Sequence, residues 1–97
     1  MNNNTFKNKT MKNDQIIIAY GLTQEEATAA HRHLISTMGC ASENVTIITD
    51  PTVIYMQSGK ISLVGIKAHA TDQQQWSKLM PTCRYLKAND IKFQIIK

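Results

Sequence analysis

The sequence contains few cysteines, and their positions exclude the commonest uses of this residue. Cys40 and Cys83 stand far apart and outside any Cys-x-x-Cys pair. A disulfide framework or a zinc knuckle requires several cysteines at close spacing. Neither residue lies in a recognisable nucleophile motif. We therefore expect two reduced structural thiols.

Long hydrophobic runs are also absent. No run approaches the roughly 18 apolar residues that span a bilayer, and residues 1–14 lack the apolar core of a signal peptide. We therefore expect no membrane association and a cytoplasmic location.

Cofactor motifs are missing as well. The chain has no Gly-x-Gly-x-x-Gly, no Walker A loop and no His-Glu-x-x-His. His31 and His33 cannot hold one ion together, because residues two positions apart on a helix point about 200° away from each other. With His69 they are the only histidines. We expect no metal and no other cofactor.

The charge balance leaves a nucleic-acid partner open. Lysine and arginine outnumber acidic residues by 11 to 7, which gives a net charge of +4 at pH 7. This excess is compatible with nucleic-acid binding but is smaller than the dense basic stripes of strong binders. The 97 residues support one domain.

The order of periodic segments predicts the fold. Residues 1–14 are rich in Asn and Lys and poor in apolar side chains, so we expect a disordered tail there. Residues 15–97 follow the order strand, helix, strand, strand, helix, strand, with a turn or hairpin before the third strand. Residues 52–57 are either a loop extension or a short extra strand. The order is the βαββαβ signature of a ferredoxin-like α+β sandwich, in which two helices cover one face of a four-stranded antiparallel sheet.

Capping spacings predict where the two helices begin. Thr23 and Glu26 have the spacing of a capping box, and Thr71 repeats it with a glutamine three residues later. The second helix should bury Trp76 in the core. It should stop or kink at Pro81, because the proline ring clashes with the preceding turn.

Basic side chains are the best candidates for binding. If they meet on one edge they would hold phosphates, which dominate nucleic-acid affinity. The alternative is that they are ordinary solvated side chains. No strand carries the paired Phe or Tyr of an RNP motif, so base stacking on the sheet face is not expected. The candidates for nucleic-acid contact are Lys60, Lys67, Arg84 and Lys87.

The polar tail and several segments between residue 15 and about residue 80 resemble one known family. They are a polar tail before the first strand, the step Arg32-His33-Leu34, a first helix that ends at Met38, Asp50 after the second strand, and the stretch ISLVGIKAHAT before the second helix. This layout is similar to that of the GhoS-type antitoxins of type V toxin–antitoxin systems, which are related in shape to small CRISPR-associated nucleases. The resemblance implies an endoribonuclease that cleaves the toxin messenger RNA, with Arg32 as a functional arginine. The chain departs from the family pattern in the spacing between Arg32 and Asp50 and after Pro81.

Two functions follow as expectations. The first is a small regulatory RNA-binding protein of the antitoxin type. If it cleaves RNA without a metal, Arg32 would stabilise charge on the scissile phosphate and His69 would move protons. The second is a non-enzymatic protein-interaction module, such as a phage- or plasmid-type accessory or anti-defence protein, which the lack of a convincing acid–base pair favours. Either would act as a monomer or a homodimer.

Overall fold

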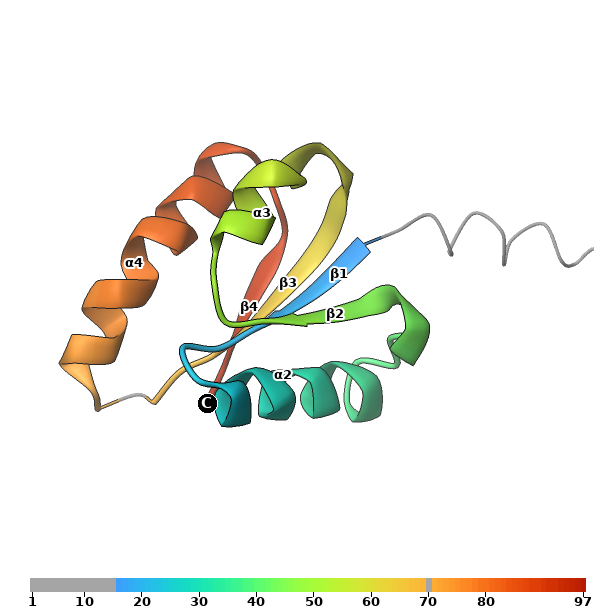
Figure 1. Ribbon diagram of the computed structural model, residues 1–97, viewed down its shortest axis with the longest axis horizontal. Coiled ribbons are helices and arrows are strands. Elements are labelled where there is room, and N and C mark those ends of the chain that lie inside the picture. The colour runs from blue at the N-terminus through green and yellow to red at the C-terminus, as the bar shows by residue number, and fades with distance from the viewer. Residues whose placement is uncertain (1–15, 70) are drawn as a thin grey trace, which may run out of the picture.

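A computed structural model describes residues 16–69 and 71–97 of the protein (Figure 1). The strands are β1 (Ile16–Tyr20), β2 (Val45–Ile48), β3 (Ile61–Lys67) and β4 (Phe93–Ile96), the α-helices are α2 (Gln24–Ser36), α3 (Thr52–Met56) and α4 (Gln73–Ala88), and the short 3-10 helices η1 (Ser42–Asn44) and η2 (Ser58–Lys60) precede β2 and β3. The tail expected over residues 1–14 lies outside the described residues.

The four strands form one parallel sheet in the order β2-β1-β3-β4. The predicted ferredoxin-like sandwich is therefore wrong, because its sheet would be antiparallel. The difference arises between β2 and β3, where the pattern predicts a hairpin but residues 49–60 form a crossover that contains α3. Consecutive strands that run parallel need a crossover connection of about a dozen residues, and this segment supplies it on the way from β2 past β1 to β3.

β1 lies in the middle of the sheet and is buried on both faces. Its residues from Ile17 to Tyr20 are all buried, and their side chains alternate between two separate core clusters. A short, nearly continuous apolar run is typical of a parallel strand that helices cover on both sides. The central strand predicted from the isoleucine run is thus confirmed, although both neighbouring strands run parallel to it, whereas an antiparallel sheet was expected.

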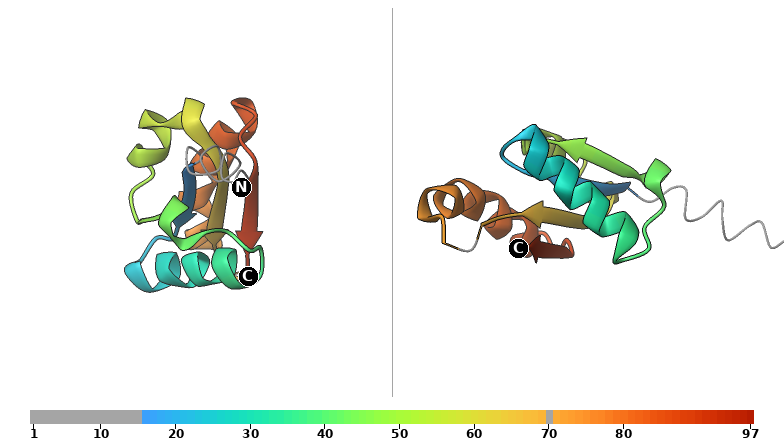
Figure 2. Two further views of the ribbon diagram at one scale, coloured as in Figure 1. Left: turned by 90° about the vertical axis from the view of Figure 1, so that its right-hand side faces the viewer. Right: turned by 90° about the horizontal axis from the view of Figure 1, so that it is seen from below.

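The helices cover both faces of the sheet. α2 lies on one face, and α3 and α4 lie on the other (Figures 1 and 2). The chain moves from β1 to one side to form β2, and then past β1 to the other side to form β3 and β4. Because crossovers are almost always right-handed, the two directions of travel place the helices on opposite faces. The α2 face is closed by Ala30 and Leu34, and the other face by Ile54, Leu79 and Leu86.

α4 differs from the sequence-based expectation in its length and in its core contacts. It continues through the exposed Pro81 to Ala88, so the helix does not stop there, which was one of the two predicted outcomes. Burial of Leu79 and Leu86 on the sheet-facing side outweighs the roughly 3 kcal/mol propensity cost of an interior proline. Trp76, predicted as a core residue, is only half-buried and packs at the margin of the cluster.

The parallel strands give the sheet two different ends. We call the end where the strands begin the amino end, and the end where they finish the carboxyl end. α2 and α4 each follow a strand and run back along the sheet, so their first turns lie at the carboxyl end and the last turn of α4 lies at the amino end (Figure 1). Within residues 16–69 and 71–97, no helix combines the length and apolar character that a membrane crossing requires.

Candidate functional site

The neighbouring carboxyl ends of β1 and β3 form a topological switch point. From β1 the chain turns through α2 toward β2, and from β3 it turns through α4 toward β4 on the other side of the sheet. In open parallel sheets, ligands bind in the crevice outside such a point. His69, a catalytic candidate from the sequence, lies in the loop that leaves β3 here.

Gly21 lets α2 begin directly against the end of β1. A Cβ atom at this position would lie 2.3 Å from the backbone nitrogen of Ala27 and 2.7 Å from the Cβ of Glu26. No side chain fits in that space, so the first turn of α2 can approach the strand only because residue 21 is glycine. This approach brings Glu26 to the switch point.

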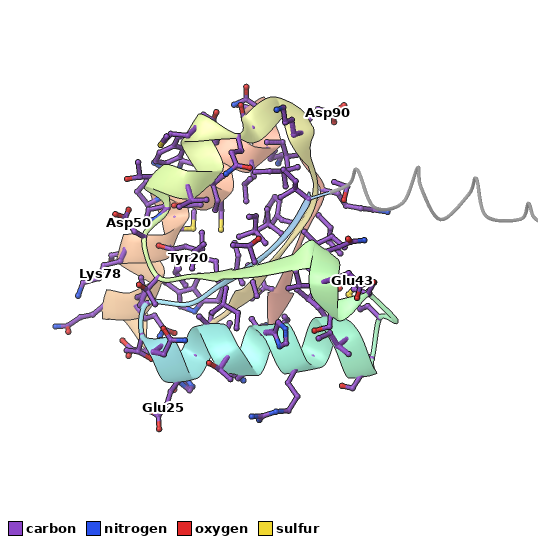
Figure 3. All side chains as sticks on the ribbon, turned by 45° about the vertical axis from the view of Figure 1, so that its right-hand side comes forward. Tyr20, Glu25, Glu43, Asp50, Lys78 and Asp90 are labelled. Carbon is purple, nitrogen blue, oxygen red and sulfur yellow. The ribbon has the colours of Figure 1, made fainter. Side chains whose placement is uncertain are left out.

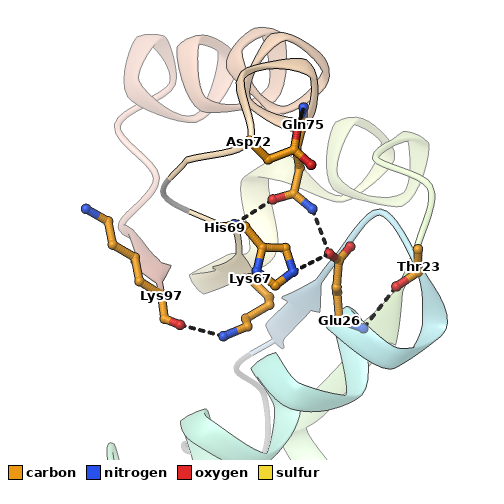
Figure 4. A network of polar contacts seen from close by, with 7 residues as sticks. All are labelled: Thr23, Glu26, Lys67, His69, Asp72, Gln75 and Lys97. Carbon is orange, nitrogen blue, oxygen red and sulfur yellow. Dashed lines mark hydrogen bonds and ion pairs between the residues drawn. The ribbon is translucent and has the colours of Figure 1, made fainter.

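Thr23 caps α2 as predicted, but Glu26 does not complete the capping box. The backbone N–H of Glu26 donates to Thr23 Oγ1 at 3.2 Å. Its carboxylate turns the other way: Oε2 accepts a 2.6 Å hydrogen bond from Gln75 Nε2 and lies 3.0 Å from His69 Nε2 (Figure 4). Glu26 therefore joins the β1–α2 loop to the β3–α4 loop.

Gln75 is the centre of this network. It is buried, at 7% exposure, and its Oε1 accepts a 2.6 Å hydrogen bond from the backbone N–H of His69. Its own backbone N–H donates to Asp72 Oδ1 at 3.0 Å. Asp72 is thus the N-cap of α4, one residue after the predicted Thr71. No sequence motif pointed to Gln75, because Glu26, which accepts its side-chain hydrogen bond, lies 49 residues earlier in the chain.

The network holds an exposed imidazole against a largely buried carboxylate. The His69 side chain is 57% exposed, whereas that of Glu26 is 15% exposed. Within the described residues, Glu26 Oε1 is buried and has no hydrogen-bond partner. The sequence-based hypothesis of RNA cleavage also needs a cation to stabilise charge on the scissile phosphate, and Arg32, the arginine suggested for this role, lies elsewhere on α2.

Arg32 is not part of the network. It lies six residues after Glu26 on α2, which is about 9 Å further along the helix axis and about 240° around it. Its side chain is exposed and makes no ion pair with any described residue. The structure therefore does not bring Arg32 and His69 together.

Lys67 also lies at the carboxyl end of the sheet. Its Nζ donates a 2.6 Å hydrogen bond to the main-chain oxygen of Lys97 (Figure 4). This contact joins the end of β3 to the end of β4. Lys67 therefore lies at the opposite end of the sheet from the other basic candidates.

The remaining basic candidates gather at the amino end. Lys60 closes η2 directly before β3, and Arg84 and Lys87 lie three residues apart, on one face of α4 near its end. Figures 1 and 2 show these segments at the same end of the molecule. Lys92, which the sequence analysis did not select, joins them: its main-chain oxygen accepts a 3.0 Å hydrogen bond from Val64 of β3. The alternation of Lys92 with apolar residues in the sequence predicts only that its side chain faces solvent. That it lies near the other basic residues follows from the strand order, which the sequence did not predict.

A hollow of about 420 Å³ opens at this end, beside β4. This volume falls within the range of about 300–1,000 Å³ that is typical of small-ligand sites. Ile91 and Phe93 supply its apolar part, while charged side chains supply the rest. Its lining residues are Lys87, Asp90, Ile91, Lys92 and Phe93.

Acidic side chains follow a different distribution. Four of them, Glu25, Glu26, Asp50 and Asp72, lie in loops or first helical turns that follow the carboxyl ends of strands. Figure 3 shows Glu25 and Asp90 at opposite ends of the molecule. Glu43 precedes β2, on the edge of the sheet opposite to β4. Among the described residues, Asp90 is therefore the acid that stands beside the basic residues at the end of α4 and before β4.

A second polar cluster lies inside the α3–α4 face. Tyr55 Oη and Thr82 Oγ1 are 3.3 Å apart, and the rings of Tyr55 and Tyr85 meet edge to face with centroids 4.6 Å apart. Burial raises the pKa of Tyr20, which also hydrogen-bonds to Thr82. The cluster packs α3 against α4.

No family model matches the chain, and no curated protein or solved structure matches it. In the part of the chain that the structure describes, no three His, Cys, Asp or Glu side chains are grouped as metal ligands would be.

Proposed function

We propose that this protein is a small RNA-binding protein that holds RNA at the amino end of its sheet. The observation that supports this proposal is the gathering of four cations there. They are Lys60, Arg84, Lys87 and Lys92.

The four cations are available for phosphate contacts. All are exposed, and none forms an ion pair with another described residue. Because Val64 of β3 pairs with Phe93 of β4, Leu63 lies beside Lys92. Lys60 precedes Leu63 by three residues, so it lies about 10 Å from Lys92 along the strand direction. Cations spread over this distance can contact more than one phosphate of a strand, and each contact adds affinity through counterion release.

The proposal is one of binding without cleavage. The pair of His69 and Glu26 lies at the carboxyl end, opposite the basic residues, and Arg32 lies outside that pair. A strand held at the amino end would keep its phosphates away from His69. A regulatory action of the antitoxin type would then rest on occupying RNA rather than on cutting it.

Fluorescence anisotropy with a labelled single-stranded RNA tests the proposal. With four phosphate contacts, we expect the affinity to fall about 50-fold between 50 and 200 mM salt, since the slope for single strands is about 0.7 per contact. The double variant Lys60→Gln/Lys92→Gln should bind more weakly and lower that slope by about 1.4. These two positions are preferred to Lys87, because a cation in the last helical turn also stabilises the helix.

The matched control is Lys78→Gln/Lys97→Gln. It removes the same charge from the first half of α4, where Figure 3 labels Lys78, and from the residue after β4, whose main-chain oxygen contacts Lys67 at the carboxyl end. We expect it to keep the wild-type salt slope. Equal loss in both double variants would mean that net charge alone attracts RNA. Failure of the wild type to bind at 50 mM salt would favour a protein partner instead.

A further inference from the structure

The turn between α4 and β4 places a carboxylate where a glycine would be expected. Asp90 has φ 58°, and the bonds around it are those that close a helix: Ile91 N–H donates to Leu86 O at 2.9 Å, and Asp90 N–H to Lys87 O at 3.2 Å. Glycine, or sometimes asparagine, normally occupies this left-handed position. An aspartate is less favourable there, because its Cβ crowds the backbone.

The Asp90 carboxylate has no partner that would account for its presence. It lines the 420 Å³ hollow together with Lys87 and Lys92, yet among the described residues it forms neither an ion pair nor a hydrogen bond. It also reduces the positive charge of the surface proposed to hold phosphates. A strained backbone conformation at a surface hollow is a reason to look for a ligand contact.

We infer that this hollow receives one unstacked base of a single-stranded RNA and that Asp90 reads its hydrogen-bonding edge. This inference rests on the proposed RNA-binding function and deepens it. Ile91 and Phe93 supply an apolar floor for the base, and Lys87 and Lys92 supply cations for the adjoining phosphates. A base can enter such a hollow only when it is not stacked in a duplex, and single strands present their bases in this way.

The chemistry of a carboxylate selects among the bases. A carboxylate only accepts hydrogen bonds, through two oxygens side by side. Guanine presents two adjacent donors, the ring N1–H and the exocyclic amine, on its Watson–Crick edge. The other bases present one donor next to an acceptor. Guanine is therefore the base that Asp90 would prefer.

Seven-nucleotide oligouridines with one central G, A, C or U provide the test, with anisotropy at fixed salt as the measurement. We expect the G oligomer to bind about 5- to 150-fold more tightly than the U oligomer, which is the range for one good bidentate contact. Asp90→Asn should reduce that preference to about twofold or less and should strengthen binding of the U oligomer, because a negative charge is removed. Asparagine tolerates the left-handed conformation, so this variant should remain folded.

Glu25→Gln is the control, since it removes one negative charge at the opposite end of the molecule (Figure 3). It should leave the base preference unchanged. Salt-dependent binding with no preference in the wild type, or a preference that survives Asp90→Asn, would overturn this inference and leave the proposed function standing. Absence of binding to every oligomer would overturn both.

Discussion

Gln75 donates a 2.6 Å hydrogen bond to the carboxylate of Glu26, 49 residues earlier in the chain. The two side chains come from the first turns of α4 and α2, which lie on opposite faces of the sheet. The contact therefore links the two helices across the carboxyl ends of β1 and β3. With His69 added, it spans the switch point where parallel sheets usually bind ligands.

Replacing Gln75 should destabilise the fold more than replacing its neighbour. Gln75→Ala leaves the Glu26 carboxylate and the His69 backbone N–H without their partner, which should cost about 1–3 kcal/mol. Gln74→Ala removes the same side chain from an exposed position in the same helical turn and should change stability by about 0.5 kcal/mol or less. Urea unfolding of both variants measures the difference. Equal midpoints would show that the hydrogen bonds do not stabilise the switch point.

Gly21→Ala should be among the most damaging single changes. The added Cβ would meet the backbone of Ala27 at 2.3 Å, and a backbone contact cannot be relieved by a rotamer change. We expect a loss of more than about 3 kcal/mol, comparable to the worst core substitutions.

Gly59→Ala is the control for Gly21→Ala, because nothing lies within 4 Å of a Cβ at that position. It should leave the thermal midpoint nearly unchanged. A stable Gly21→Ala protein would mean that α2 can begin further from β1 than the structure indicates.

The parts of the fold that depend on local signals were predictable from the sequence. The isoleucine run of β1 and the cap at Thr23 depend only on residues close to them in the sequence. The strand and the helix start predicted from these signals are both confirmed. The cap of α4 was placed one residue early, because Thr71 and Asp72 are both good capping residues. Pro81 does not end α4, which was one of its two predicted effects, because the packing of the buried side of the helix is a tertiary effect that local signals do not contain.

The strand order was not predictable from the same signals. Residues 52–56 read TVIYM, a β-branched and aromatic run that favours a strand by propensity, yet they form the one-turn helix α3. Burial of Ile54 against the sheet outweighs that preference. Without α3, the segment before β3 reads as a hairpin, and the parallel sheet becomes an antiparallel one.

The candidate site was predictable in residue type but not in position. Lys60, Arg84 and Lys87 do gather at one end, whereas Lys67 lies at the other end of the same strand that Lys60 precedes. A seven-residue strand separates them by roughly 20 Å, which only the strand direction reveals. Asp90 could have been noticed, because it follows an asparagine at the end of a helical pattern.

Pro81→Ala should stabilise the protein. Alanine restores a backbone N–H in the interior of α4 and has the best helix propensity, which together can contribute up to about 3 kcal/mol. Proline also restricts the unfolded chain, so part of this gain is lost. We expect a net gain of about 1 kcal/mol, measured by urea unfolding. A decrease would indicate that the proline ring makes packing contacts that alanine cannot replace.

Stability should fall in alkaline solution partly because of Tyr20. Burial raises the pKa of its phenol above the ordinary value of 10.0, and the hydrogen bond with Thr82 opposes that shift only in part. The folded state therefore keeps the Tyr20 proton at pH values where the unfolded state has lost it. The contribution of Tyr20 to the free energy of unfolding is fully present below pH 10 and is lost as the pH rises through the folded pKa, by at most about 1.4 kcal/mol per pH unit.

Tyr20→Phe should lose less stability between pH 10 and 11 than the wild type does, as followed by urea unfolding at each pH. Tyr55→Phe is the control for loss of a hydroxyl that contacts Thr82. Because burial is the largest cause of the raised pKa of Tyr20 and the Tyr55 phenol only a smaller one, this variant should keep most of the alkaline loss. Partial burial also raises the pKa values of the Cys40 and Cys83 thiols, and their effect, which begins near pH 9, is common to all three proteins. An unchanged alkaline loss in Tyr20→Phe would place the titrating group elsewhere.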